Sequence, residues 1–296
     1  MVRRIARMTS ITHYKKCLVG YIDILGFKDM VYSSKNCQDK LSLIDGVLES
    51  FKQLETKSLW SRDVVDVEED AQRKDMDLFD LTKNIKCTCF SDSIAISVEV
   101  SKNDVNEKAS TFIANLSRIG AELLCKGVLI RGAITIGDVV HKRNGVFYGT
   151  GLIEAYQLEA STASQPRIII STNLINQLNY PLNAKRDRYP YHQYLDRYED
   201  GCVGFSQLMF YQVMQNSTII TKGQLADSLL QIRTVIINGL DSHFESPTIF
   251  LKYKWLMEEY RKLIIFNDDK KEILDVELPD SRHNIHYAYI NQRIRD

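Results

Sequence analysis

The 296-residue sequence contains no uninterrupted apolar run of about 18 residues, so we expect no membrane-spanning helix. Its basic N-terminus lacks the apolar segment of a secretory signal, which favours a cytoplasmic protein. There is no excess of charge either, since Lys and Arg number 38 and Asp and Glu also number 38. Chains built for generic nucleic-acid binding are normally basic, so we expect no nucleic-acid partner.

The sequence also lacks the paired spacing of a zinc site. Cys87 and Cys89 are two residues apart in one predicted strand, but no second Cys or His pair follows at zinc-finger spacing. The other cysteines are Cys17, Cys37, Cys125 and Cys202. Because most of these residues lie in apolar surroundings, we interpret them as reduced, mostly buried thiols.

Strand-like and helix-like segments alternate in the first half of the chain. Apolar spacing and β-branched content predict a strand at 17–25, a helix at 41–54, a hairpin of strands at 86–90 and 94–100, a helix at 104–125 and a strand at 128–136. This order is that of the ferredoxin-like βαββαβ fold. We therefore predict an α+β core, mostly antiparallel, with the first strand central, the hairpin beside it and both helices on one face.

The remaining segments extend this core. Residues 27–36 are predicted to be a loop and 56–83 a charged surface insertion; a glycine-rich loop at 145–151, a helix at 152–161, strands at 167–171 and 203–213, and an irregular stretch at 179–200 follow. Helices are predicted from 222 onwards and at 253–265. No linker or repeat interrupts the chain, so we expect a catalytic domain at 1–215 and a helical C-terminal extension at 216–296.

Asp23 is an isolated carboxylate in the otherwise apolar predicted strand CLVGYIDIL. A lone buried carboxylate costs several kcal/mol unless a positive group compensates its charge. A metal ion, a lysine or a nest of backbone amides would compensate it. The alternative is a structural aspartate that caps a turn or forms a salt bridge.

Asp92 lies at the tip of the predicted hairpin. In a βαββαβ sheet this tip and the end of the first strand meet at one edge, so Asp23 and Asp92 would together offer the oxygen ligands that hard divalent cations prefer. Two such cations about 3.5 to 4 Å apart form a phosphoryl-transfer site. The alternative for Asp92 is an ordinary hairpin-turn aspartate.

The turn after Asp23 reads Ile24-Leu25-Gly26-Phe27-Lys28 and leads from strand to helix. Its backbone N–H groups are suited to cradle a triphosphate, and the Ile24 carbonyl is suited to bind one metal. Tyr21 shares a strand face with Asp23 and is predicted to line the base or ribose pocket, unless it is a core tyrosine. Arg131 is predicted to neutralise phosphate charge, with a salt bridge along the sheet as the alternative.

Together these segments resemble class III nucleotidyl cyclases. Tyr21 to Phe27 resembles their first metal motif, Asp-Ile-x-Gly-Phe, and Phe90 to Ser93 resembles their second metal hairpin. Ile130 to Val139 resembles their Arg-x-Gly-Ile strand, and Gly149 to Glu159 resembles the helix that follows it. The resemblance covers residues 17–172.

The resemblance implies that Asp23, Ile24 and Asp92 hold two Mn²⁺ or Mg²⁺ ions and that the two aspartates are catalytic. A compact cyclase with a helical extension is most similar to the pyrimidine cyclases of bacterial Pycsar antiphage defence. That similarity implies conversion of UTP or CTP to the 3′,5′-cyclic nucleotide by a homodimer with interface active sites, and a product that acts on a separate effector protein.

Several positions depart from the family pattern. Thr88 stands where adenylate-forming members carry a base-reading Lys, and Val146 to Gly149 replace the stretch with the base-reading Asp. Ile153 and Gln157 stand where the family carries a transition-state Asn and Arg. The chain therefore reads a different base or is an inactive nucleotide-binding sensor. A third alternative is another palm-type phosphoryl-transfer enzyme, such as a cyclic-dinucleotide synthase.

Overall fold

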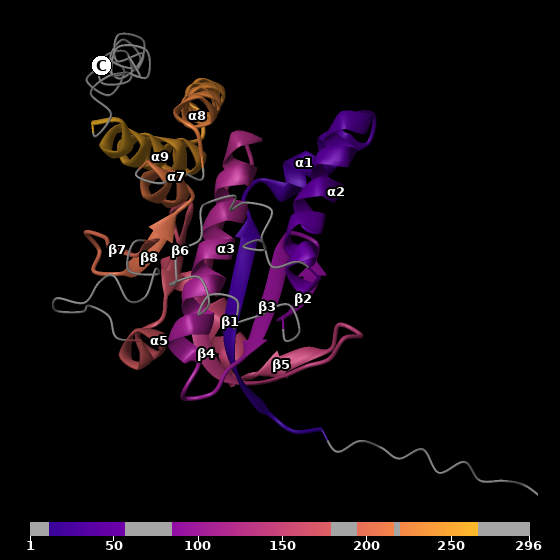
Figure 1. Cartoon of the computed structure of the whole chain (residues 1–296). Coiled ribbons are helices and arrows are strands. Elements are labelled where there is room, and N and C mark those ends of the chain that lie inside the picture. Colours follow the sequence, from indigo (N-terminus) through magenta and orange to yellow (C-terminus); the bar gives the residue numbers. More distant parts are fainter. Residues whose placement is uncertain (1–11, 57–84, 179–193, 216–219, 266–296) are drawn as a thin grey trace, which may run out of the picture.

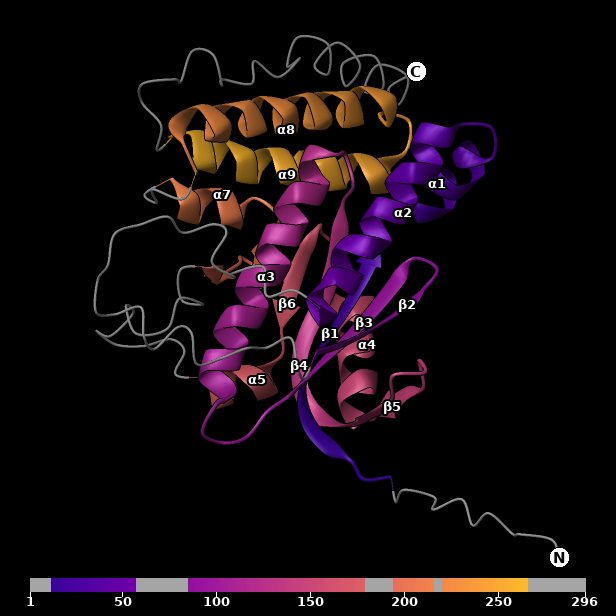
Figure 2. The same cartoon turned by 45° about the vertical axis from the view of Figure 1, so that its right-hand side comes forward.

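Figures 1 and 2 show the computed structural model, in which residues 12–56, 85–178, 194–215 and 220–265 are described. The charged insertion predicted at 56–83 lies almost entirely outside these residues, as does most of the irregular stretch predicted at 179–200. The part of the C-terminal extension after residue 265 also lies outside them.

The strands are β1 (Lys15–Ile24), β2 (Ile85–Phe90), β3 (Ser93–Glu99), β4 (Ile130–His141), β5 (Phe147–Gly149), β6 (Arg167–Ile170), β7 (Asp196–Arg197) and β8 (Val203–Ser206). The α-helices are α1 (Phe27–Ser34), α2 (Gln38–Lys52), α3 (Val105–Cys125), α4 (Thr150–Thr162), α5 (Thr172–Gln177), α7 (Met209–Met214), α8 (Lys222–Ser242) and α9 (Pro247–Ile265). A short 3₁₀ turn, η1 (Gln53–Glu55), follows α2.

The strands form one sheet in the order β2-β3-β1-β4-β6-β8-β7, with β5 paired to β4 outside this path. Among the described strands only the β4–β6 pair is parallel, and the other pairs are antiparallel. The α+β prediction is therefore confirmed, with β1 between the β2–β3 hairpin and β4. This topology brings the end of β1 to the turn of the hairpin.

The two faces of β1 pack against different helices because successive strand residues point to opposite sides. Leu18 and Ile22 belong to the main core, together with Phe51 of α2 and Phe112 of α3. On the other face, Val19 packs in a smaller cluster with Ala155 of α4. The two predicted core helices cover one face, as expected, and α4 lies on the other side of the sheet (Figure 2).

Three local predictions were wrong. Phe27–Ser34 forms helix α1 where a loop was predicted, because Phe27 is buried in the core and anchors the first turn. Phe147–Gly149 forms β5 on Val139–His141 where a glycine-rich loop was predicted, because pairing with a distant strand stabilises it. The strand predicted at 203–213 ends at Ser206, and its second half forms α7.

The C-terminal helices α8 and α9 lie across the end of the sheet at which β1 ends (Figures 1 and 2). A capping box of Thr221 and Gln224 begins α8. The two helices approach closely at Gly239, where an added Cβ atom would lie 2.2 Å from Cε1 of Tyr253. Within the described ranges, none of the helices is both long and apolar enough to cross a membrane.

Candidate functional site

The β2–β3 hairpin places Asp92 beside the end of β1. Asp23 pairs with Ser93 in the sheet register, and the Ile24 N–H donates a hydrogen bond to the Asp92 carbonyl at 2.9 Å. Ser91 has a positive φ of 55°, a conformation that costs a non-glycine residue energy and tightens this turn. Asp23 and Asp92 thus occupy adjoining positions at one edge of the sheet, as the sequence predicted.

Asp23 forms an ion pair with Arg131, its register partner on β4. The Arg131 Nε donates a hydrogen bond to Asp23 Oδ2 at 2.9 Å and also lies 2.8 Å from Oε1 of Glu159 on α4. The salt bridge along the sheet is therefore the arrangement that this structure contains. One guanidinium compensates two carboxylates in a partly water-excluded position.

Glu159 is the most deeply buried member of this cluster, with a side chain only 4% exposed. Its Oε1 lies close to Arg131 but has no hydrogen bond of good geometry within the described residues. Burial raises the pKa of Glu159, Arg131 opposes that rise, and the negative charges of Asp23 and Asp92 add to it. The edge therefore carries three carboxylates and one guanidinium, which is a net negative environment suited to a cation.

The carboxylates of Asp23 and Asp92 fit a metal ion that takes its remaining ligands from substrate and water. Within the described ranges, no group of three or more His, Cys, Asp or Glu side chains is placed to hold a metal ion by itself. Mg²⁺ and similar hard ions are commonly held by one or two carboxylates together with substrate phosphates. Asp23 and Asp92 offer that number of carboxylates, and the backbone of Ile24 lies beside them.

Tyr21 lies on β1 two residues before Asp23. Its hydroxyl donates a hydrogen bond to Ser93 Oγ at 2.9 Å, and its ring packs edge-on against Tyr156 of α4. Burial raises the pKa of the Tyr21 phenol. The residue is half-buried and fixed at one side of the candidate metal edge.

Gly26 and Phe27 form the turn after β1, next to the edge that carries Asp23. Gly26 caps α1 with a positive φ of 75°, which favours glycine at this turn. The Phe27 side chain is buried in the core, so a ligand would meet only its backbone. The first N–H groups of a helix have no partner within the helix and attract anions.

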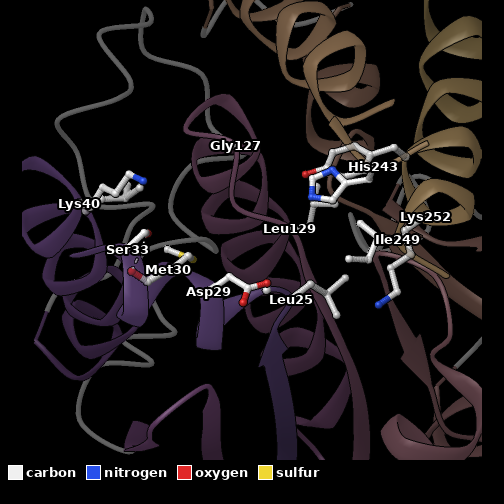
Figure 3. A pocket seen from close by; sticks show the side chains of 13 residues that line it. Leu25, Asp29, Met30, Ser33, Lys40, Gly127, Leu129, His243, Ile249 and Lys252 are labelled. Carbon is white, nitrogen blue, oxygen red and sulfur yellow. Dashed lines mark hydrogen bonds between the residues drawn. The ribbon is translucent and has the colours of Figure 1, made fainter. Parts of the chain in front are cut away.

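A cavity of about 470 Å³ opens beyond the end of β1, between α1, α2 and the C-terminal helices (Figure 3). Gly26 lines it, whereas Asp23, Asp92 and Arg131 do not. Its charged or titratable lining residues are Asp29, Lys40, His243, Lys252 and Tyr253. Lys252 lines the cavity and also feels the charges of the carboxylate edge. Burial and then Arg131 lower the pKa of Lys252, and Asp23 opposes that shift.

The sequence interpretation missed Glu159 and Lys252 as members of the site. A signal for Glu159 was present, because Gly151, Ala155 and Glu159 recur every four residues on the buried stripe of α4. A charge on such a stripe requires a partner. No comparable signal identified Lys252, which reaches the site only through the packing of α9 against the end of the sheet.

No family model and no curated protein matches this sequence. Among solved structures, the chain is similar to the catalytic core of a rhodopsin-guanylyl cyclase with converted specificity in complex with ATPαS, with 13% identity, 56% of this chain, 81% of that chain and a TM-score of 0.37. It is also similar to the monomeric guanylyl cyclase domain of the RhoGC fusion protein from the aquatic fungus Blastocladiella emersonii. That match has 14% identity, covers 56% of this chain and 85% of that chain, and has a TM-score of 0.37.

A class III adenylyl cyclase-like ATP-binding protein from Pseudomonas aeruginosa gives 12% identity, 56% of this chain, 35% of that chain and a TM-score of 0.34. Identities and TM-scores this low assign neither a family nor an activity.

Proposed function

We propose that this chain is a divalent-metal-dependent nucleotidyl cyclase that converts UTP or CTP to the 3′,5′-cyclic nucleotide and pyrophosphate. The observation that carries the proposal is the register that sets Asp23 beside the hairpin turn holding Asp92. The net negative edge, the open backbone of the β1–α1 turn and the neighbouring cavity support it. The resemblance of the sequence segments to class III cyclases supports the reaction type.

In the proposed reaction the ribose 3′-oxygen bonds to the α-phosphorus, the bond to the β-phosphate oxygen breaks, and the 3′-hydroxyl proton passes to water. Two Mn²⁺ or Mg²⁺ ions, when bound, would acidify that hydroxyl and neutralise the triphosphate. Asp23 and Asp92 would hold the ions, with the Ile24 carbonyl as a further ligand. The N–H groups at Gly26 and Phe27 would orient the phosphates.

Arg131 would exchange its ion pair with Asp23 for a phosphate oxygen when nucleotide and metal arrive. Its side chain is 27% exposed, so the guanidinium is accessible from the site. Glu159 would keep Arg131 oriented after Asp23 turns to the metal, because the Arg131 Nε already lies 2.8 Å from Oε1 of Glu159. Tyr21, held by Ser93, would line the base or ribose pocket.

Pyrimidine selectivity is part of the proposal. Thr88, at the family's base-reading Lys position, is buried and its hydroxyl is hydrogen-bonded to Nε2 of His141 at 2.8 Å. That position therefore offers no charged side chain to a purine base. A role in antiphage defence, with the cyclic nucleotide acting on a separate effector, rests on the sequence resemblance alone.

A homodimer is also part of the proposal. Large apolar side chains are exposed on α4 and β5, among them Ile153 and Tyr156, which are 56% and 52% exposed. Such a surface at the edge of the site suits a second copy of the chain. The catalytic domain would span 1–215 and the extension 216–296.

A catalytically inactive nucleotide sensor is the second candidate. The ion pair between Arg131 and Asp23 favours it, because that pair already neutralises a carboxylate that a metal would need. Ile153 and Gln157, at the family's Asn and Arg positions, favour it as well. A sensor would bind nucleotide without releasing pyrophosphate, and a cyclic-dinucleotide synthase would give a product of about twice the mass.

The test is incubation of the purified protein with Mn²⁺ and each of the four ribonucleoside triphosphates, with products identified by mass. We expect cyclic UMP or cyclic CMP from the wild type and a loss of at least 1,000-fold in rate, in order of magnitude, for Asp23→Asn and for Asp92→Asn. Asp138→Asn, an exposed aspartate on β4, is the matched control and should stay active. Nucleotide binding without any product would support the sensor instead.

A further inference from the structure

The C-terminal helices supply one wall of the cavity beyond β1. Lys252 and Ile249 of α9 line it, together with His243 from the end of α8. In Figure 3 the Lys252 side chain extends from α9 into the cavity, with its nitrogen directed toward Leu25. The β1–α1 turn lies on the opposite wall, where Gly26 also lines the cavity. A residue from the far end of the chain thus faces the turn that follows Asp23.

Lys252 is a charged residue without a direct polar partner in the described part of the structure. Within the described ranges its ammonium forms no hydrogen bond and no salt bridge, unlike Lys15, Lys52 and Lys108. Burial and the Arg131 guanidinium both lower the pKa of Lys252, and Asp23 is the acidic group that opposes them. A half-buried ammonium close to a second cation is destabilised until an anion arrives.

The other polar groups that line the cavity would also affect the binding of an anion. His243 Nδ1 donates to the Gly239 carbonyl at 2.9 Å, which leaves Nε2 as the ring nitrogen that is free of that bond. Lys40 contributes a second ammonium from α2. Asp29, in the first turn of α1, contributes the opposing carboxylate. Two lysines and one aspartate therefore line a space of about 470 Å³, with Lys252 on the wall opposite Asp29 and Lys40 (Figure 3).

We propose that Lys252 binds the terminal phosphates of the nucleotide, so that the C-terminal helices complete the substrate site of their own chain. This inference rests on the proposed function, because it takes the cavity as the polyphosphate end of that site. The observation that supports it is the position of the unpaired Lys252 opposite Gly26, which lies in the turn that follows Asp23 on β1.

The test measures binding rather than turnover, by isothermal titration calorimetry of the full chain with UTP, CTP, UMP, CMP and inorganic pyrophosphate. Lys252→Met should weaken the triphosphates and pyrophosphate about 10- to 100-fold, the range for losing a charged hydrogen bond, and leave the monophosphates unchanged. Lys252→Arg should restore most of the affinity. Lys254→Met, an exposed lysine two residues further along α9, is the control and should bind like the wild type.

Asp29→Asn tests whether the phosphates bind in this cavity, and its expected effect on affinity is opposite to that of Lys252→Met. Removing the carboxylate from the cavity should strengthen triphosphate binding about 3- to 10-fold, because a like charge near the phosphates is lost. Equal circular dichroism spectra and melting temperatures would show that each variant is folded. An unchanged triphosphate affinity in Lys252→Met, or an equal loss for mono- and triphosphates, would overturn the proposal.

The outcomes also separate this inference from the proposed cyclase. If the wild type binds triphosphate and Lys252→Met does not, while no cyclic product forms, Lys252 keeps its role and the cyclase activity is refuted. If cyclic product forms and Lys252→Met binds and turns over like Lys254→Met, the cyclase stands and the role of Lys252 is refuted. A wild type that binds neither triphosphate nor pyrophosphate refutes both.

Discussion

Replacing Arg131 by Met tests how the site manages its negative charge. Arg131 is the guanidinium between Asp23 and Glu159, whose side chains are 17% and 4% exposed. Removing one partner of a buried ion pair typically costs about 3 to 5 kcal/mol. Because Arg131 itself is 27% exposed and water reaches it, we expect the low end, about 3 kcal/mol at pH 7. For a chain of this size that is a melting temperature lower by about 6 to 12 °C.

The deficit of Arg131→Met should depend on pH. Burial already raises the pKa of Glu159, and the variant loses the opposing effect of Arg131. A carboxyl whose folded pKa lies above its unfolded value binds its proton more tightly in the folded state, so it favours folding at low pH and loses that contribution as pH rises. The difference from the wild type should therefore shrink as pH falls toward the unfolded value of Glu159.

Thermal unfolding between pH 4.5 and 8, with and without Mn²⁺, measures both effects. The double variant Arg131→Met/Glu159→Gln, which removes the buried charge as well, should regain most of the stability. Mn²⁺ should raise the melting temperature of Arg131→Met more than that of the wild type, because Asp23 no longer has a guanidinium partner. A variant as stable as the wild type at pH 7, or an equal Mn²⁺ effect in both, would refute the reasoning.

Two further predictions concern packing and buried polar contacts. Gly239→Ala should cost about 1 to 3 kcal/mol, because its Cβ would lie 2.2 Å from the Tyr253 ring, whereas the Cβ in Gly223→Ala on the same helix would make only an ordinary 3.9 Å contact with Thr221 Oγ1 and should be tolerated in thermal denaturation. His141 is buried between Thr88 and Ser97, and burial lowers its pKa from 6.5 to about 4. The unfolded state therefore takes up a proton first, and the wild type should lose up to about 3 kcal/mol as pH falls from 6.5 to 4. A His141→Gln variant with the same pH dependence in urea titrations would contradict this.

The elements that the sequence predicted well are those whose patterns are local. The apolar stripe at 104–125 predicted α3 almost residue for residue. The two β-rich segments on either side of Ser91 and Asp92 predicted the β2–β3 hairpin. Helix α1 was missed because FKDMVYSS is only eight residues long and Phe27 anchors it through contacts with the core. Strand β5 was missed because three residues become a strand only when β4 lies alongside them.

The sequence by itself determined the order of the core elements, the isolated carboxylate in β1 and the aspartate at the hairpin turn, because each depends on neighbouring residues. The tertiary structure decided which charges meet. Sheet register set Arg131 opposite Asp23, the packing of α4 brought Glu159 to the same guanidinium, and α9 carried Lys252 to the cavity beyond β1. These contacts join residues far apart in the chain, and electrostatic interaction depends on distance in space, which no local pattern encodes.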